Sequence, residues 1–258
     1  EVVRLLVLLT KPKEGMRICD PTCGSGGMLV QSWRFVKEKK GNPDNITLHG
    51  QESNYSTVGM SKMNLVLHGV SDFRIEHGDT LDNPLLQEDG KLLSYDRVLA
   101  NFPFSENWKA QGKENDPYDR FRLGIPPAKD KADFAFIQHM YSTLNDKGQA
   151  AIISSQGVLF RGSTEAAIRQ GLYDEDAVEA IIALPTKLFF GTGIPACVMI
   201  LNKNKPKARK DKIIFIYGAK DYRKGKNRNT LRDEDITTMV KTFDDFKDVD
   251  RYCHIADS

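Results

Sequence analysis

Short apolar runs alternate along the chain with longer segments in which apolar residues recur at helical spacing. This alternation predicts strand–helix–strand units and a mostly parallel sheet. The predicted strands span residues 17–20, 46–50, 73–76, 95–100, 148–154, 178–184, 196–201 and 213–217. The predicted helices span residues 1–9, 27–39, 54–68, 133–144, 163–172 and 231–243. We therefore expect an α/β fold with a doubly wound, mostly parallel sheet.

Residues 105–130 interrupt this pattern, because they are rich in Gly, Pro, Asn and charge and show no clear periodicity. A loop of this length inside a compact domain is uncommon and is usually functional or mobile. Its aromatic residues Trp108 and Tyr118 have two interpretations: they contact a nucleic acid, or they anchor the loop to the domain.

Composition excludes several classes of protein. None of the apolar runs in the 258 residues approaches the roughly 18 to 20 residues that span a bilayer, and no secretory signal is present. We expect a cytoplasmic protein. The four cysteines lack metal-ligand spacing, so free thiols and no metal site are expected. The chain starts at Glu1 within a predicted helix, so we expect further residues before it.

The net charge is only +2, but residues 203–232 are strongly basic. Within this run only Asp211 and Asp221 oppose the cations. Three interpretations remain open: a solvated surface, a patch that faces phosphates, or a contact with another subunit. The basic residues are Lys203, Lys205, Lys207, Arg209, Lys210, Lys212, Lys220, Arg223, Lys224, Lys226, Arg228 and Arg232.

A glycine-rich turn follows the first predicted strand. The strand ends at Asp20, and the sequence Pro-Thr-Cys-Gly-Ser-Gly-Gly over residues 21–27 leads into a predicted helix. Such a strand–turn–helix junction is typical of nucleotide and nucleoside sites, because glycines allow the backbone to approach a ligand closely. The spacing is not G-x-G-x-x-G, so a dinucleotide is not the first expectation. A tight connection without a ligand is the alternative.

Acidic residues follow three predicted strands in succession: Asp20, Glu52 and Asp79. In a doubly wound sheet, ligands bind at the edge where parallel strands end. A carboxylate at Glu52 is placed to accept both hydroxyls of a ribose, and one at Asp79 to accept an adenine amino group. A single acid at such a position is more often a helix cap, but three beside a glycine turn favour a nucleoside site.

The fourth strand ends in the tetrapeptide Asn101-Phe102-Pro103-Phe104. An exocyclic amine on an aromatic ring is a poor nucleophile because its lone pair is delocalised. If the Asn101 amide oxygen and the Phe102 carbonyl accept its protons, the lone pair is released for attack. Phe104 can then stack on the base, which must be flipped out if it comes from a duplex. Alternatively, the tetrapeptide is a turn with two core aromatics.

Together these segments resemble the modification subunit of type I restriction–modification systems, which is an S-adenosylmethionine-dependent, adenine-specific N(6) DNA methyltransferase. The resemblance runs from Glu1 to about Lys205. It implies a seven-stranded, Rossmann-like class I methyltransferase core over residues 1–205, with residues 206–258 as a basic extension of the same domain. The matching segments are residues 20–27, 50–52, 78–81, 101–104, 133–136, 157–162 and 190–195.

The residues and the resemblance together give a predicted site. The cofactor is S-adenosylmethionine, with its methionine part over the glycine turn, and the catalytic residues are those of the tetrapeptide 101–104. The expected cofactor-binding residues are Asp20, Pro21, Thr22, Cys23, Gly24, Ser25, Gly26, Gly27, Glu52, Ser53, Asp79, Thr80 and Leu81.

The family implies partners as well. Its members act in complexes of two modification subunits with one specificity subunit, which a restriction subunit can join, so DNA and these subunits are the expected partners. The family usually has Asn-Pro-Pro-Phe where this chain has Phe102. The backbone carbonyl survives this change, but the rigidity of proline is lost, so a lower activity is expected.

Other functions fit the same residues. A protein glutamine or an RNA base also offers an amide or amine to the tetrapeptide. A scaffold that binds the cofactor without catalysis would follow if Phe102 has disabled the site. A nicotinamide-dependent oxidoreductase is disfavoured by the glycine spacing.

Overall fold

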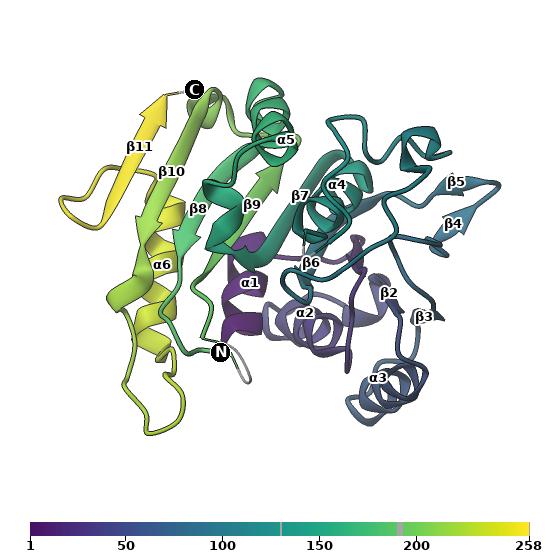
Figure 1. The fold of residues 1–258 in the computed structure, drawn as a ribbon. Coiled ribbons are helices and arrows are strands. Elements are labelled where there is room, and N and C mark those ends of the chain that lie inside the picture. The colour runs from purple at the N-terminus through teal and green to yellow at the C-terminus, as the bar shows by residue number, and fades with distance from the viewer. Residues whose placement is uncertain (130, 190–192, 258) are drawn as a thin grey trace.

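The computed structural model describes residues 1–129, 131–189 and 193–257 (Figure 1). In this part of the chain, nine strands form one sheet in the order β11-β10-β8-β9-β7-β6-β1-β2-β3. These strands are β1 Arg17–Asp20, β2 Thr47–Glu52, β3 Arg74–His77, β6 Tyr95–Asn101, β7 Leu144–Ser155, β8 Val178–Ala183, β9 Ala196–Asn202, β10 Lys212–Tyr217 and β11 Cys253–Asp257. A separate hairpin pairs β4 Gln87–Glu88 with β5 Lys91–Leu92.

Helices cover both faces of this sheet. They are α1 Val2–Thr10, α2 Gly27–Glu38, α3 Tyr55–Leu67, α4 Asp133–Ser142, α5 Thr164–Asp174 and α6 Asp233–Asp245. Apolar residues of α1, α2, α3 and α6 belong to one buried cluster, and those of α4 and α5 belong to another. Strand residues alternate between the two clusters, as Ile152 and Ile153 of β7 do, because successive side chains of a strand point to opposite faces. The expected doubly wound α/β fold is confirmed.

Most strands run in one direction. β3, β2, β1, β6 and β7 pair in parallel. β9 is antiparallel to both β7 and β8, so β8 runs the same way as β7, and β10 is parallel to β8. All strands of the sheet except β9 and β11 therefore end at one edge, which we call the carboxyl edge. It is the lower edge in Figure 1, toward which β8 and β10 point.

The sheet extends beyond the seven strands that the family implies. β10 was expected as a further strand, and it pairs with β8 at the margin of the main sheet. β11 was not predicted, and it pairs with β10 in antiparallel register from Lys212 opposite Asp257 to Ile216 opposite Cys253. Its five residues carry little apolar pattern of their own, so the pairing depends on the free edge that β10 presents.

The long segment between β6 and α4 is held to the domain by its aromatic residues. Trp108 is buried, packs on Phe121 with ring centroids 5.2 Å apart, and donates its indole N–H to the carbonyl of Pro127 at 3.1 Å. Tyr118 donates its hydroxyl to Oε1 of Gln87 at 2.7 Å. The structure therefore supports the interpretation in which these two residues anchor the loop.

All four cysteines are buried and free of disulfide bonds. In the described ranges, none of the helices is both long enough and apolar enough to cross a membrane.

Candidate functional site

A cavity of about 560 Å³ opens at the carboxyl edge, where β1, β2 and β6 end. This volume lies in the range of pockets that bind a nucleoside-sized ligand. It brings together twelve of the predicted site residues from four separate segments. They are Pro21, Thr22, Gly24, Glu52, Ser53, Asp79, Thr80, Leu81, Asn101, Phe102, Pro103 and Phe104.

The remaining predicted residues do not line this cavity. They are Asp20, Cys23, Ser25, Gly26 and Gly27. Six further lining residues were not predicted as site residues. They are Gly78, Glu106, Asn107, Trp108, Phe136 and Phe189.

The glycine turn is compact because two of its residues adopt left-handed backbone angles. Gly24 has φ of +52° and Gly26 has φ of +80°. Residues other than glycine adopt these backbone angles only at a cost in free energy. A Cβ atom on Gly26 would lie 2.7 Å from Oγ of Ser61 in α3. The turn therefore packs directly on α3, and only glycine fits at position 26.

Glu52 is held by one carboxylate oxygen to the glycine turn and by the other to the start of α3. The Gly24 N–H donates to Oε2 at 3.0 Å, and the Asn54 N–H donates to Oε1 at 2.8 Å. The orientation of the carboxylate at the cavity wall is thereby fixed. Oε1 also accepts the Ser53 hydroxyl at 3.4 Å, whereas Oε2 keeps a second lone pair that can accept a hydrogen bond from a ligand.

Asp20 lies beneath the turn and is 2% exposed. Burial raises the pKa of Asp20 to about 7, the Thr22 backbone N–H works against this shift, and the charge of Glu52 adds to it. Its Oδ1 accepts the Thr22 N–H at 3.1 Å. The structure thus gives Asp20 a place in the support of the turn and not on the cavity surface.

The segment after β3 forms another wall of the cavity, and its shape is fixed by its own hydrogen bonds. Oδ1 of Asp79 accepts the N–H groups of Leu81 at 2.8 Å and Asp82 at 3.1 Å. The buried Gln51 side chain bonds the same segment at the Gly78 carbonyl, at 3.1 Å. One oxygen of Asp79 is therefore used within the protein, and Oδ2 is left for a ligand.

Arg120 holds the same segment from the other side and was not identified from the sequence. It is 2% exposed, and it donates to the carbonyls of Thr80 at 2.9 Å and Leu81 at 3.0 Å. It also forms an ion pair with Asp116, whose side chain is 3% exposed. Burial and the charge of Arg120 lower the pKa of His139 to about 3, so this neighbour is neutral. About forty residues separate Arg120 from the carbonyls that it binds, so no local sequence signal could reveal the contact.

The side chains of the tetrapeptide at the end of β6 lie in two environments, the cavity and the core. Asn101 is exposed at the carboxyl edge, and its side chain makes no hydrogen bond to any residue that the structure describes. The Phe102 ring is 1% exposed and stacks on Phe136 at a centroid distance of 4.9 Å. Phe104 lies edge-on to Phe102 at 6.2 Å and to Phe189 at 6.0 Å. The Asn101 side-chain amide thus lies at the cavity, whereas the Phe102 ring packs in the core.

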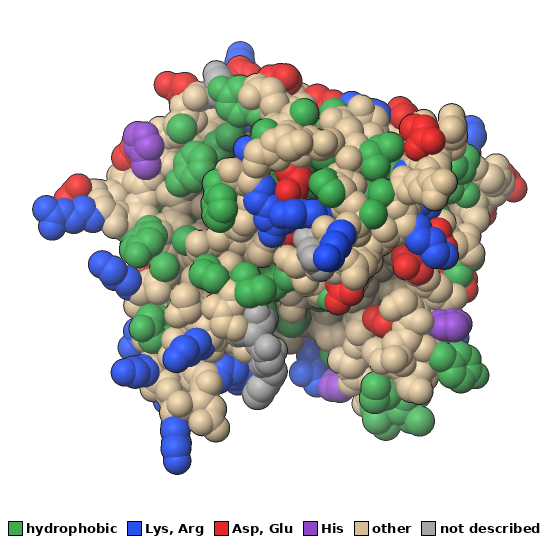
Figure 2. All heavy atoms as spheres, viewed as in Figure 1, with side chains coloured by type: hydrophobic (Ala, Val, Ile, Leu, Met, Phe, Trp, Pro, Cys, Tyr) green, Lys and Arg blue, Asp and Glu red, His purple; other side chains and the backbone are tan. Residues whose placement is uncertain are grey.

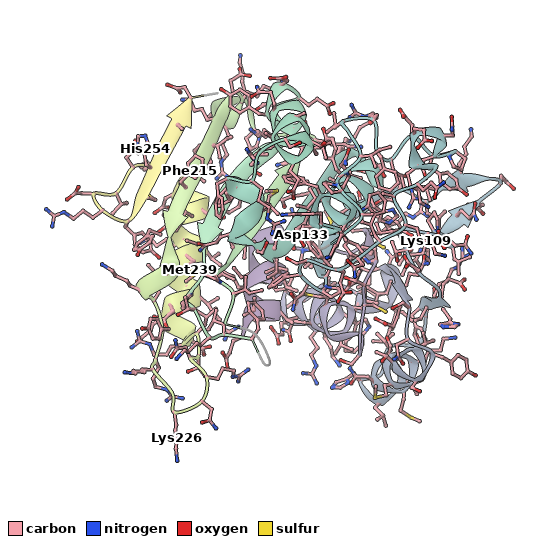
Figure 3. The ribbon with its side chains drawn as sticks, in the orientation of Figure 1. Lys109, Asp133, Phe215, Lys226, Met239 and His254 are labelled. Carbon is pink, nitrogen blue, oxygen red and sulfur yellow. The ribbon has the colours of Figure 1, made fainter. Side chains whose placement is uncertain are left out.

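Asp133 fixes the chain just after the tetrapeptide. This fully buried residue, near the middle of Figure 3, accepts the Ser105 N–H on Oδ1 at 2.8 Å. Its Oδ2 accepts from Arg161 at 2.9 Å and from the Ser155 hydroxyl at 3.1 Å. The sequence marks Asp133 only as the start of a family segment, and the fold reveals that it anchors the exit from β6.

The segment before β9 is only partly covered by the structure. Phe190, Gly191 and Thr192 of the motif over residues 190–195 lie outside the described residues. Phe189, directly before them, lines the cavity, and the Pro195 carbonyl accepts the Gln156 N–H at 2.9 Å.

A glycine turn, a fixed carboxylate on the next strand and a mostly parallel sheet in which β9 lies antiparallel between β7 and β8 are the features of a class I methyltransferase fold. The model of the N-6 DNA Methylase family matches residues 1–258, and the chain belongs to that family. The methylase subunit of the type I restriction enzyme MjaVIII from Methanocaldococcus jannaschii is 39% identical over 272 residues, covering 100% of this chain and 45% of that protein. The HindI methylase subunit of Haemophilus influenzae is 33% identical, covering 97% of this chain and 55% of its own length.

Solved structures agree with this assignment. The methyltransferase subunit of a type I restriction–modification system from Streptococcus thermophilus has a TM-score of 0.90 and 35% identity, covering 99% of this chain and 54% of that one. A modification subunit from Vibrio vulnificus, at 21% identity and a TM-score of 0.80, shares the fold. The chain spans about half the length of the relatives that it matches. The resemblance drawn from the sequence is confirmed.

Proposed function

We propose that this chain is the catalytic core of an adenine-specific DNA methyltransferase that uses S-adenosylmethionine. The observation that carries the proposal is that Glu52 and Asn101, from two different strands, line one cavity beside the glycine turn. The first is suited to a ribose and the second to an exocyclic amine. The relatives are named as methylase subunits of type I restriction enzymes and the family as N-6 DNA Methylase, which supports DNA as the substrate.

The donor set of the cavity fits the cofactor. In this proposal the Gly24 turn and Thr22 hold its amino acid part, Glu52 accepts its ribose hydroxyls, and the free oxygen of Asp79 accepts its adenine amino group. When bound, the cofactor supplies an electrophilic methyl group on a sulfonium. The predicted residues that do not line the cavity, Asp20 and Gly26 among them, support the turn.

The transfer then depends on how the protein holds the target amine. The Asn101 side-chain oxygen and the Phe102 carbonyl accept hydrogen bonds from its two N–H groups, which frees the nitrogen lone pair for direct attack without a covalent enzyme intermediate. The nitrogen would take the methyl group as the carbon–sulfur bond breaks, and it would then release one of its protons to solvent. Phe104 offers a ring at the cavity wall for the flipped base. Positioning of the two reactants supplies most of the rate in such a mechanism.

The proposal extends to the organisation of the protein. Residues 1–205 form the methyltransferase core, and residues 206–258 form a basic extension of the same domain. A specificity subunit, a second copy of this subunit and a restriction subunit are the proposed partners, since a modification core of this family lacks an obvious reader of DNA sequence.

The test is methyl transfer to DNA by the full-length protein with its partners, using labelled cofactor. Asn101→Ala should abolish transfer while leaving cofactor binding, measured by calorimetry, largely unchanged. Asn204→Ala, which changes an exposed amide beyond the end of β9, should behave like the wild type. Full activity of the Asn101→Ala protein would contradict the mechanism.

A second measurement tests the cofactor site. Glu52→Ala should weaken binding of S-adenosylmethionine strongly, and a reduced nicotinamide dinucleotide should not bind. Glu52→Gln, which keeps an acceptor for the Gly24 or Asn54 N–H, separates loss of the ribose contact from loss of the turn. Cofactor binding without transfer to DNA would favour the scaffold, and transfer only to RNA or protein would favour the other substrates.

A further inference from the structure

Strand β10 divides the basic run into two groups at opposite edges of the sheet. Residues 203–210 connect β9 to the start of β10, so they lie at the edge away from the cavity. Residues 218–232 follow the end of β10, so they lie at the carboxyl edge, where the cavity opens. The sequence shows one continuous run, and the fold separates it.

Two cations of the first group, Lys205 and Arg209, are used inside the protein. Lys205 is 4% exposed and pairs with Asp176. Arg209 pairs with Glu179 at 2.9 Å and lies 4.5 Å over the Phe246 ring. These cations tie β8, β10 and α6 together and are not free to bind another molecule.

The second group contains a protruding segment of different character. Residues 222–230 form a loop that is closed by backbone hydrogen bonds between Arg223 and Thr230 at 2.9 and 3.1 Å, and we call this loop the basic arm. Arg223, Lys224 and Lys226 on the arm are exposed and form no ion pair with the described residues. Lys226 marks its tip in Figure 3, and Figure 2 shows Lys and Arg side chains gathered around it.

The acids near the arm are already engaged. Asp221, at its base, accepts the hydroxyl of Tyr252. Glu1 pairs with Arg228 at 3.5 Å and accepts the Leu231 N–H. Neither acid forms an ion pair with Arg223, Lys224 or Lys226, so these three exposed cations have no ion-pair partner among the described residues.

The arm is hydrogen-bonded to a segment that leads to the cavity. Buried Asn229 donates its side-chain amide to the Thr186 carbonyl at 2.8 Å and its backbone N–H to the Lys187 carbonyl at 2.9 Å. The segment that carries these carbonyls continues to Phe189, which lines the cavity. The position of the arm relative to the cavity is thus set by hydrogen bonds.

The cavity itself cannot attract a phosphate backbone. It is lined by the acids Glu52, Asp79 and Glu106, and none of the described lysines or arginines lines it. A polyanion whose base enters this cavity needs cations beside the opening, because neutralised phosphates supply most of the affinity of a protein for DNA.

We propose that the basic arm binds the phosphate backbone of DNA beside the base that enters the cavity, through Arg223, Lys224 and Lys226. The inference rests on the proposed function for its substrate. The arm reads no sequence; it contributes affinity and holds the duplex at the carboxyl edge.

The experiment compares two triple variants of the full-length protein, in complex with its partner subunits, that carry the same change in charge. The arm variant is Arg223→Ala/Lys224→Ala/Lys226→Ala. The control variant is Lys147→Ala/Lys207→Ala/Lys210→Ala, which removes three exposed cations from the opposite edge. Binding of a fluorescent DNA duplex is followed by anisotropy over a series of salt concentrations.

In the arm variant, we expect binding at least about tenfold weaker, and a slope of log affinity against log salt that is smaller by about 3, since each phosphate contact contributes about 1. The control variant should keep the wild-type slope. At saturating DNA the arm variant should keep the wild-type rate of methyl transfer, so its effect falls on KM.

Three results would overturn the proposal. An unchanged affinity and slope in the arm variant would show that the arm does not bind DNA. Equal losses in both variants would show a general effect of charge. Loss of subunit assembly with unchanged DNA binding would assign the arm to a protein partner. Because binding is measured directly, failure of the wild type to methylate DNA would count against the proposed function and not against the arm.

Discussion

The Phe102 ring stacks on the Phe136 ring with centroids 4.9 Å apart and planes 18° apart, so the residue that replaces the family's usual proline is part of the core. The side chain is 1% exposed and lies in the cluster that α4 and α5 form with the sheet. The replacement thus adds a buried ring, while the backbone of residue 102 stays at the cavity.

Phe102→Ala is therefore expected to lower the free energy of unfolding by about 3 to 5 kcal/mol, the usual cost of emptying a phenylalanine site in a core. Urea unfolding measures the change. Phe215→Ala, at a half-exposed ring on β10, is the matched control and should cost much less. If both variants lose the same free energy of unfolding, the stacking of Phe102 on Phe136 does not stabilise the core more than a half-exposed ring does.

Asp20 makes stability depend on pH. Burial raises its pKa to about 7, far above the usual value of 3.8, so the folded state holds a proton that the unfolded state has lost between these pH values. Stability from this group is complete below about pH 4 and is lost as the pH rises through 7. The loss is at most roughly 4 kcal/mol, at 1.36 kcal/mol for each pH unit between the two pKa values.

Asp20→Asn should remove this dependence, because an amide keeps an acceptor for the Thr22 N–H and has no proton to release. Unfolding by urea at pH 5 and at pH 8 gives the comparison, and the variant should lose less stability than the wild type between them. Asp72→Asn, at an exposed position, serves as the control and should keep the wild-type difference. If Asp20→Asn loses as much stability between pH 5 and pH 8 as the wild type does, Asp20 is not the source of the pH dependence.

The ion pair between Arg120 and Asp116 should connect fold stability to cofactor affinity. Arg120→Ala leaves a buried carboxylate unpaired, which typically costs 3 to 5 kcal/mol, and frees the carbonyls of Thr80 and Leu81. We expect lower stability together with weaker binding of S-adenosylmethionine.

A double-mutant cycle separates these effects. Asp116→Ala/Arg120→Ala should recover part of the stability, since no unpaired charge remains, but cofactor affinity should stay low because the carbonyls are still unbound. Lys109→Ala removes an exposed partner of Asp82 and should leave the unfolding midpoint unchanged. Recovery of cofactor affinity in the double variant would show that Arg120 acts only through stability.

Much of the core architecture follows from local pattern. Ile18 and Leu48 sit in short apolar strands, Asp20 and Glu52 end those strands, and parallel pairing then brings the ends together. Nearly all helices and strands of the main sheet were predicted within a few residues of their observed bounds. β11 was missed because its partner edge exists only in the folded sheet.

Site residues that belong to continuous sequence motifs could be predicted. Site residues that act through contacts with distant segments could not. Asn101 and Glu52 were identified from strand ends, and both line the cavity. Arg120 and Phe136 were not, since their contacts lie with segments tens of residues away. Asp20 was identified as a cofactor ligand, but it lies beneath the turn, because a strand end can face the core as well as the ligand.

The sequence by itself determined the order of strands and helices, the glycine turn and the acids that follow β1, β2 and β3, because these depend on local periodicity and backbone freedom. Only the tertiary structure decided which of these side chains reach the cavity, and how Arg120 braces its wall. It also decided that β10 sends half of a basic run to the carboxyl edge while Lys205 and Arg209 are used on the other side. Those outcomes depend on contacts between residues far apart in the chain, and their energies come from burial that exists only once the sheet has formed.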